Sequence, residues 1–243
     1  PKHPQFEGQE SFGGRILHPA RWPDDFDAKG KRVAILGNGS TGVQLLAPIA
    51  AEAEQVHVFQ RTPQWISPRA GYGKAVEPEI RWLLDHFPGY WNWWRYMAIA
   101  ALFQTHHNLQ PDDAWRATGG KVNALNDKLR DDLTAYIKAQ TGGRQDLIDR
   151  LIPDYAPFSR RPVVDNGWYQ ALTRDNVELV TDGIARLTPT GIETTDGKLR
   201  EVDYIVTATG FDIIKYLWPT KYTGRGGLDL HAEGYGGDGL RPA

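Results

Sequence analysis

Apolar positions form short runs near the start of the chain and again toward its end, with helical spacing between them. The runs at 33–36 and 55–59 predict two strands, and the first is apolar enough to be buried on both faces. Residues 42–51 place their apolar side chains on one face of a helix, although Pro48 allows a kink or an early end. A strand, a helix and a strand within about thirty residues match the size of a β-α-β crossover. The pattern therefore predicts parallel strands joined by a helix.

The middle of the chain changes to helical spacing, and β character returns after it. We expect helices over 79–87, 90–103 and 112–140. Short strands are expected at 177–180, 183–187, 191–195 and 202–207. The first thirty residues are rich in proline, glycine and aromatic residues without a clean period, which indicates an ordered linker. The fold class that follows is α/β, a Rossmann-like domain with a helical insertion.

Tryptophans are concentrated in the expected helices of the middle segment. Core packing of helices is the commoner use of such residues, and we expect it here in preference to membrane contact. The residues concerned are Trp82, Trp91, Trp93 and Trp94.

Composition narrows the classes of function. The 243 residues are 40% apolar and 24% charged, and 28 basic side chains against 30 acidic ones give a net charge of −2, which indicates neither nucleic-acid nor anionic-membrane binding. There are no cysteines, so disulfides, thiolate metal sites and a cysteine nucleophile are excluded. No signal peptide is visible, and the longest apolar run, 97–103, is too short to span a bilayer. We expect a cytoplasmic protein without a metal site.

A glycine-rich loop follows the first predicted strand. It reads Gly37-Asn38-Gly39-Ser40-Thr41-Gly42, which is G-x-G-x-x-G between a strand and a helix. In such loops the first glycine makes a tight turn, the second lets the backbone approach a pyrophosphate, and the third lets the helix pack closely. A turn without a ligand is the alternative. The context on both sides favours a nucleotide site.

The end of the second strand indicates which nucleotide binds. NAD-specific sites place an acidic residue there, whereas this chain has Gln60-Arg61-Thr62. A guanidinium can pair with the 2′-phosphate of NADP in a forked geometry. Arg61 is therefore the candidate phosphate clamp, with a solvated loop arginine as the alternative. We expect NADP at this loop rather than NAD or FAD.

The segment Phe12 to Pro23 fits F-x-G-x-x-x-H-x-x-x-W-P at every fixed position. Together with the glycine loop that follows, it resembles the type I Baeyer–Villiger monooxygenases. These enzymes use FAD, NADPH and O2 to insert an oxygen atom beside a ketone carbonyl, giving an ester or lactone. The resemblance implies a role in domain coupling for the motif residues, although a structural role is an almost equal alternative for the histidine. They are Phe12, Gly14, His18 and Trp22.

The resemblance also gives a role to two adjacent arginines, which spacing alone would leave as solvated charges. In this family a pair of the form K/R-R-P-x-x-D precedes an aromatic pair, as Arg160-Arg161-Pro162 does here, with Trp168 replacing the first tyrosine. Arg161 would be the active-site arginine that stabilises the flavin peroxide anion, and Arg160 would help to bind the NADP phosphate. Thr209 and Gly210 match the "ATG" segment that returns the chain to the flavin domain.

The resemblance covers nearly the whole chain and predicts its domain organisation. The Trp-rich segment 88–96 is most similar to the hydroxyacetophenone monooxygenase branch. A separate flavin fingerprint is absent, so we expect an internal fragment whose partners are the FAD-domain segments of the same polypeptide, a ketone and O2. The expected parts are a linker at 1–30, an NADP-binding domain at 31–75 and 151–210, the helical insertion at 76–150, and a truncated FAD and substrate portion at 211–243.

Two other functions remain open from the sequence. Flavin monooxygenases that oxidise nitrogen or sulfur show a similar motif, but theirs ends in Tyr or Phe, so Trp22-Pro23 argues against them. A non-catalytic NADP-binding module is the other alternative. Such a module should begin with its own first element, whereas this chain opens in a linker.

Overall fold

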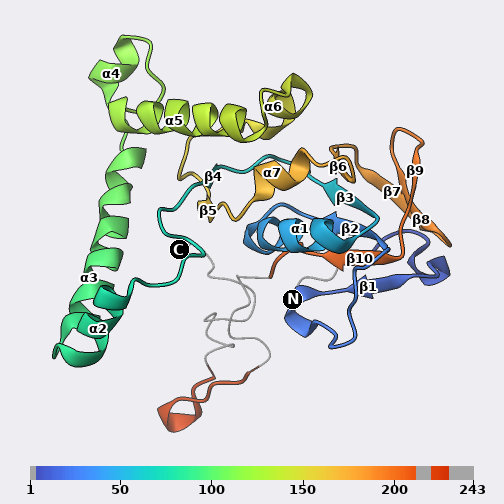
Figure 1. Ribbon diagram of the computed structural model, residues 1–243, viewed down its shortest axis with the longest axis horizontal. Helices are drawn as coiled ribbons and strands as arrows, with labels where there is room; N and C mark the ends of the chain where they lie inside the picture. Colours follow the sequence, from blue (N-terminus) through green and yellow to red (C-terminus); the bar gives the residue numbers. More distant parts are fainter. Residues whose placement is uncertain (1–3, 212–219, 230–243) are drawn as a thin grey trace.

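A five-stranded parallel sheet, at the right in Figure 1, is the main sheet of the described residues. The computed structural model describes residues 4–211 and 220–229. Residues 212–219 and 230–243, which belong to the predicted C-terminal portion, lie outside the described residues. The order of the strands across the sheet is β1 (Arg15–Leu17), β10 (Tyr204–Thr207), β2 (Arg32–Leu36), β3 (Gln55–Phe59) and β6 (Val177–Val180).

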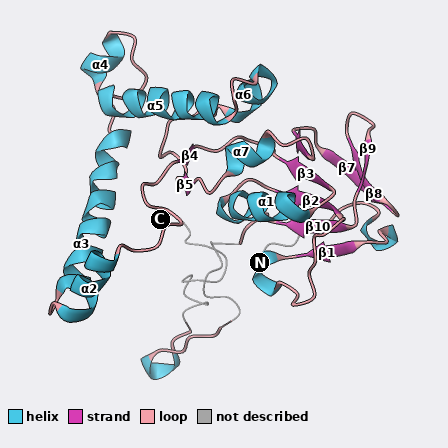
Figure 2. Cartoon of the chain, viewed as in Figure 1, coloured by secondary structure: helices cyan, strands magenta, loops and turns pink. Residues whose placement is uncertain are grey.

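Each face of this sheet is covered by a different layer. Because successive side chains of a strand point to opposite faces, Val33 and Ile35 of β2 face one core and Ala34 and Leu36 face the other. The first core is closed by four helices: α1 (Ser40–Glu52), α5 (Ala124–Gln140), α6 (Gln145–Leu151) and α7 (Trp168–Leu172). The second is closed by an antiparallel sheet of β7 (Ile184–Thr188), β8 (Gly191–Thr194) and β9 (Leu199–Glu201), as Figure 2 shows. These layers confirm the α/β class with a parallel sheet.

The segment at 1–30, expected to be a linker, contributes a strand to the parallel sheet. Its residues Arg15–Leu17 form β1 and pair in parallel with Tyr204–Val206 at the edge of the sheet. The strand is only three residues long and only Leu17 is buried, so it leaves no hydrophobic period in the sequence. Short 3₁₀ turns flank it at Gln9–Ser11 and Pro19–Arg21.

The prediction of a single helix over 112–140 is wrong. The structure divides it into α4 (Asp113–Ala117) and α5, which begins after Asn123. Gly119 has a φ of +96°, and a side chain at Gly120 would overlap the indole of Trp115, so the chain turns there. The Asn123 side chain then accepts a hydrogen bond from the Asn126 N–H and starts α5. Two further 3₁₀ turns lie at Gln104–Leu109 and Arg225–Gly227.

The expectation that the tryptophans pack in a core is also wrong. Trp82 lies on α2 (Pro78–His86), Trp91, Trp93 and Trp94 lie on α3 (Tyr90–Phe103), and all four are between 42% and 59% exposed. The two helices stand away from the sheet (Figure 1). On α3 the aromatic rings stack on one another, with the Trp91 and Trp94 centroids 5.9 Å apart. Among the described residues, no helix is long and apolar enough to cross a membrane.

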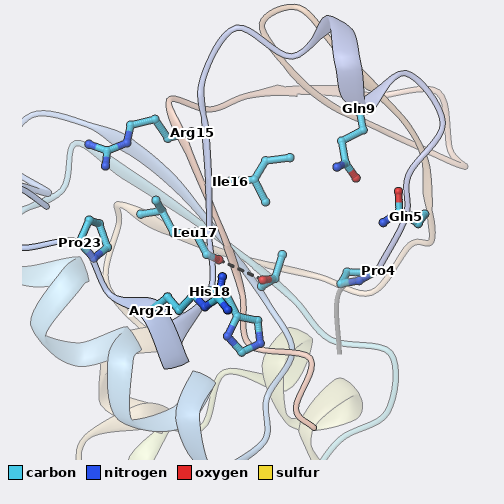
Figure 3. A pocket seen from close by; sticks show the side chains of 10 residues that line it. Pro4, Gln5, Gln9, Arg15, Ile16, Leu17, His18, Arg21 and Pro23 are labelled. Atoms are coloured by element: carbon cyan, nitrogen blue, oxygen red, sulfur yellow. Dashed lines mark hydrogen bonds between the residues drawn. The ribbon is translucent and has the colours of Figure 1, made fainter. Parts of the chain in front are cut away.

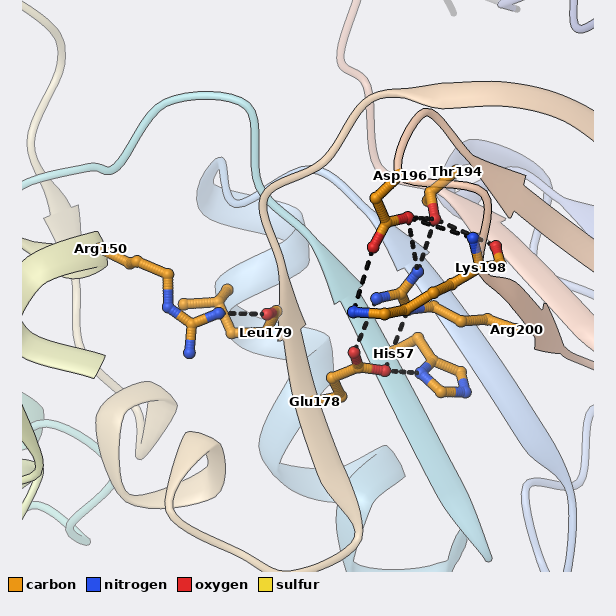
Figure 4. A network of polar contacts seen from close by, with 8 residues as sticks. All are labelled: His57, Arg150, Glu178, Leu179, Thr194, Asp196, Lys198 and Arg200. Atoms are coloured by element: carbon orange, nitrogen blue, oxygen red, sulfur yellow. Dashed lines mark hydrogen bonds and ion pairs between the residues drawn. The ribbon is translucent and has the colours of Figure 1, made fainter. Parts of the chain in front are cut away.

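A buried arginine joins the two sheets. Arg200 of β9 is 6% exposed and donates Nε and Nη2 to the Glu178 carboxylate of β6, at 3.0 and 2.8 Å (Figure 4). Glu178 also accepts from His57 Nδ1 at 2.8 Å, and Arg200 Nη1 donates to Thr194 Oγ1 at 2.6 Å. Asp196 accepts the Thr194 hydroxyl proton. The antiparallel layer is thereby fixed to the parallel sheet by charge-assisted hydrogen bonds.

Glu178→Gln should destabilise the fold because it removes the carboxylate that accepts two hydrogen bonds from the buried Arg200 guanidinium. We expect the free energy of unfolding to fall by about 3 kcal/mol in denaturant titrations. Glu193→Gln is the matched control, since Glu193 pairs with Arg186 at 2.8 Å on the exposed side of the small sheet. It should cost less than about 1 kcal/mol. Equal effects of the two variants would contradict the joining role.

Acid should weaken the fold through the same cluster. Burial lowers the pKa of His57 below its ordinary 6.5, although Glu178 opposes this shift. At Glu178 burial favours a raised pKa, but hydrogen bonds from Arg200 and His57 outweigh it and lower the pKa below 4.5. The unfolded chain therefore takes up both protons at higher pH than the folded chain, and stability falls as the pH drops through 6.5 and then 4.5. Denaturant titrations should show this loss, and His57→Gln should remove its upper part; an unchanged profile would contradict the assignment.

Candidate functional site

The predicted site residues follow four neighbouring strands at one edge of the sheet. His18 follows β1, Thr209 comes two residues after β10, Gly37 follows β2 and Gln60 follows β3. Because all these strands are parallel, their carboxyl ends meet at the same edge. The chain leaves β2 through α1 toward β3, while β10 lies on the other side of β2. In open α/β sheets, ligands bind at this kind of reversal in strand order.

Two of the three loop glycines are required by contacts within the protein. Gly37 has a φ of +110°, and a Cβ there would lie 2.8 Å from the Ala208 carbonyl oxygen. A Cβ at Gly42 would overlap the carbonyl oxygen of Gly37. At Gly39, by contrast, a Cβ would meet no described protein atom within 4 Å. The middle glycine therefore faces open space in front of the helix.

The helix that begins at this space offers donors to an anion. Gly39 is the N-cap residue of α1 and supplies no side-chain hydrogen bond, Ser40 is exposed and Thr41 is half-buried. The first-turn N–H groups of this 13-residue helix therefore have no side-chain cap. Free N–H groups and the positive end of the helix dipole together make a binding site for phosphate.

Arg61 lies beside this helix end at the end of β3. Its side chain is exposed and makes no hydrogen bond or ion pair within the part of the chain that the structure describes. The residues on either side of it are held in place. Gln60 is 3% exposed, and the Thr62 carbonyl accepts from Asn38 Nδ2 at 2.8 Å. Asn38, predicted as part of the nucleotide loop, thus has its side chain turned inward, with 8% exposed.

The basic pair lies in the loop that leads into β5 (Val163–Val164). That strand pairs with β4 (Ile66–Ser67), which brings the pair toward the segment after Arg61. The Arg160 guanidinium stacks on the ring of Tyr155, 4.4 Å from its centroid, whereas Arg161 is exposed and makes no polar contact with described residues. The two side chains therefore have different surroundings, as expected for adjacent residues with different partners.

No pattern in the sequence predicts a role for Tyr155. Its hydroxyl donates to the Pro63 carbonyl at 3.0 Å and contacts Gln64 Oε1 at 2.7 Å, while its ring supports Arg160. Burial raises the pKa of Tyr155, although Arg160 opposes the shift, so the phenol stays protonated and can donate. Tyr155 thus ties the Arg160 loop to the Arg61 loop. Contacts between residues that lie 91 and 92 positions apart leave no local signal in the sequence.

The motif residues at the start of the chain pack around β1 and β10. A Cβ at Gly14 would overlap both the Phe12 ring and the Asp203 carbonyl oxygen, and Trp22 packs edge-on against Phe26 at 4.6 Å. His18 is 9% exposed, and its Nδ1 accepts from the Ala20 N–H, so its proton sits on Nε2. The His18 ring contacts the Phe211 ring at 5.9 Å, just after Gly210.

An open cavity lies along the outer edge of β1. Its volume is about 610 Å³, and His18, Arg15 and Thr207 are among the residues that line it (Figure 3). The Thr207 hydroxyl, which lines this cavity, donates to the Leu17 carbonyl at 3.0 Å. Among the described residues there is no group of three histidine or carboxylate side chains placed to hold a metal ion.

Comparison with known proteins relates this architecture to one family. Residues 1–77 match the model of the flavin-binding monooxygenase-like family. An uncharacterized monooxygenase of Sinorhizobium fredii is 36% identical over 93% of this chain and 34% of its own length. The chain is therefore similar in sequence to flavin-binding monooxygenases. The similarity runs through almost the whole chain, not only through the motif at its start.

Two further relatives carry more specific names. A Baeyer–Villiger monooxygenase of Pseudooceanicola batsensis is 31% identical over 93% of this chain and 46% of its own length. A crystal structure of a cyclohexanone monooxygenase mutant from Rhodococcus, bound to NADP+, is 28% identical, superposes with a TM-score of 0.76, and is matched over 96% of this chain and 49% of that one. The chain thus spans less than half the length of the curated relatives it matches.

Gly42 and Gly39 should respond differently to alanine. Gly42→Ala must displace the Gly37 carbonyl and should lower the free energy of unfolding by about 1–3 kcal/mol. Gly39→Ala adds a methyl group to open space at a φ of −73°, so it should change stability by less than about 1 kcal/mol. Thermal or denaturant unfolding of the two variants provides the measurement. If Gly39→Ala proved the more destabilising, the middle glycine would be structural.

Proposed function

We propose that this chain is the NADP-binding part of a flavin-dependent monooxygenase of the Baeyer–Villiger type. The observation that carries the proposal is the set of groups at the carboxyl edge of the sheet. After β2 come Gly39, which faces open space, and the uncapped N-terminus of α1. After the adjacent strand β3 comes Arg61, which has no partner among the described residues. These groups match the pyrophosphate and the 2′-phosphate of NADP in chemistry.

The residues present fit NADP better than NAD. No acidic side chain follows β3, where an NAD site would place one, and Gln60 at that position is buried. Gly37, Gly39 and Gly42 would hold the pyrophosphate together with the N–H groups of Ser40 and Thr41. Arg61 and Thr62 would contact the 2′-phosphate, and Arg160 would add charge nearby. That a solved relative of similar fold binds NADP+ supports this assignment.

The described residues do not contain a second site of this kind. They hold one G-x-G-x-x-G loop between a sheet strand and a helix, and its surroundings fit the nicotinamide nucleotide. When FAD is bound, it supplies the redox chemistry with O2. We propose that a further part of a longer polypeptide binds it, since the relatives are more than twice the length of the matched region.

Arg161 is our candidate catalytic residue. Its exposed guanidinium has no partner among the described residues, so it can stabilise negative charge that develops on reacting oxygen. Phe12, Gly14, His18 and Trp22 would couple the domains, and Thr209 and Gly210 would contact the cofactor where β10 ends. A ketone is the proposed substrate, and the Trp-rich α3 favours the hydroxyacetophenone branch.

Arg61→Ala should weaken NADP+ binding by ten- to a hundredfold, the effect of losing a charge-assisted pair, and leave NAD+ binding unchanged. Calorimetric titration of the complete polypeptide with each nucleotide measures this. Arg174→Ala is the matched control, because Arg174 is also exposed but lies at the opposite end of the sheet, before β6. Equal loss of NADP+ and NAD+ affinity would contradict the role of Arg61.

Arg161→Ala should lower ester formation by about two to three orders of magnitude in the FAD-loaded complete protein, because it removes a fixed charge from the reacting centre. NADPH should still reduce the flavin at the wild-type rate in anaerobic mixing experiments. Wild-type ester formation by the variant would refute the assignment. Oxygenation of amines or sulfides but not of ketones would favour the N- or S-oxidising class, and NADP+ binding without any turnover would favour a non-catalytic module.

A further inference from the structure

We propose that Gln60 and Asn38 are positioning residues that set the preference for NADP by holding the Arg61–Thr62 segment at the carboxyl edge. The inference rests on the proposed function, because it concerns the same nucleotide site. Neither side chain would need to touch the nucleotide. Both act through Arg61, which has no contact of its own to fix it among the described residues.

Gln60 occupies a buried position directly before Arg61. Its Oε1 accepts from Asn38 Nδ2 at 2.9 Å, its Nε2 donates to the Arg150 carbonyl at 2.7 Å, and its backbone N–H donates to the Val180 carbonyl at 2.8 Å. The amide therefore bridges the loop after β2 and the end of α6. Arg150 in turn donates to the Leu179 carbonyl of β6 at 2.8 Å (Figure 4).

Asn38 completes the bridge from the glycine loop. Its Nδ2 carries two protons, and one goes to Gln60 Oε1 while the other goes to the Thr62 carbonyl at 2.8 Å. The residues on both sides of Arg61 are thereby tied to the loop that would hold the pyrophosphate. On the far side, the Tyr155 hydroxyl donates to the Pro63 carbonyl. Arg61 is exposed, but the backbone that carries it is fixed on both sides.

The chemistry of position 60 explains why an amide stands there. The side chain must accept from one neighbour and donate to another, which glutamine does and a glutamate carboxylate does not. A buried carboxylate would also face the Arg150 carbonyl oxygen and place negative charge near the 2′-phosphate site. Glutamine at position 60 thus stands where an NAD site would have an acidic residue. The same side chain orients the arginine that favours NADP.

The test is a double-mutant cycle in the complete polypeptide, read by calorimetric titration with NADP+ and NAD+. Gln60→Met keeps the volume but removes both side-chain hydrogen bonds. We expect NADP+ affinity to fall about tenfold with NAD+ affinity unchanged. Adding Gln60→Met to Arg61→Ala should cost nothing further, because the glutamine acts through the arginine. Asn38→Leu, which breaks the bridge from its other end, should give the same split and serves if Gln60→Met folds poorly.

Gln170→Met is the matched control, since Gln170 is exposed on α7 and, among the described residues, its side-chain amide bonds only to Gln140. It should leave both affinities unchanged. Parallel losses of NADP+ and NAD+ affinity, or additive effects of Gln60→Met and Arg61→Ala, would show a merely structural role and overturn the inference. If wild-type protein prefers NADP+ and only Arg61→Ala alters that preference, the inference fails while the proposed function stands. If wild-type protein binds neither nucleotide, both fail.

Discussion

The close backbone approach between the ends of β2 and β10 is the constraint on which the rest of the site depends. The Gly37 carbonyl lies where a side chain at Gly42 would be, and the Ala208 carbonyl lies where a side chain at Gly37 would be. Three backbone segments meet there without side chains between them. This contact brings the first turn of α1 over the sheet, with its N–H groups pointing to the carboxyl edge. The other proposed contacts to a dinucleotide depend on the position of this first turn of α1.

The remaining layers hold that edge rigid while leaving it open. Helices cover one face of the sheet and the antiparallel strands cover the other, where the Arg200–Glu178 pair joins them to β6. Neither layer extends over Ser40, Arg61 or Arg161, and these residues are exposed. Functional groups on loops that a rigid scaffold positions are the usual arrangement for binding sites. The proposed nucleotide site has this form.

The sequence predicts the central strands well, because each is a short run of mostly apolar side chains, although His57 interrupts the run in β3 and Glu178 the run in β6. The strands expected at 55–59 and 177–180 match β3 and β6 to the residue, and the expected four-residue strand at 33–36 is β2. The misses have local causes. β1 is too short to show a period, Gly119 and Gly120 interrupt a helix whose polar pattern continues, and apolar content alone does not tell buried tryptophans from exposed ones. Within the site, the glycines and Arg61 follow from motif chemistry, whereas the roles of Gln60 and Tyr155 depend on contacts between distant segments.

Amide hydrogen exchange in the presence and absence of NADP+ tests the central claim most directly, because it reports which backbone groups the nucleotide covers. Saturating NADP+ should slow exchange at the first-turn amides of α1, Ser40 to Gly42, and at Arg61 and Thr62. Exchange in the β7–β9 sheet, on the other side of the parallel sheet, should stay unchanged. Binding of NADP+ that leaves the α1 amides unprotected, or protects a different edge of the molecule, would contradict the account.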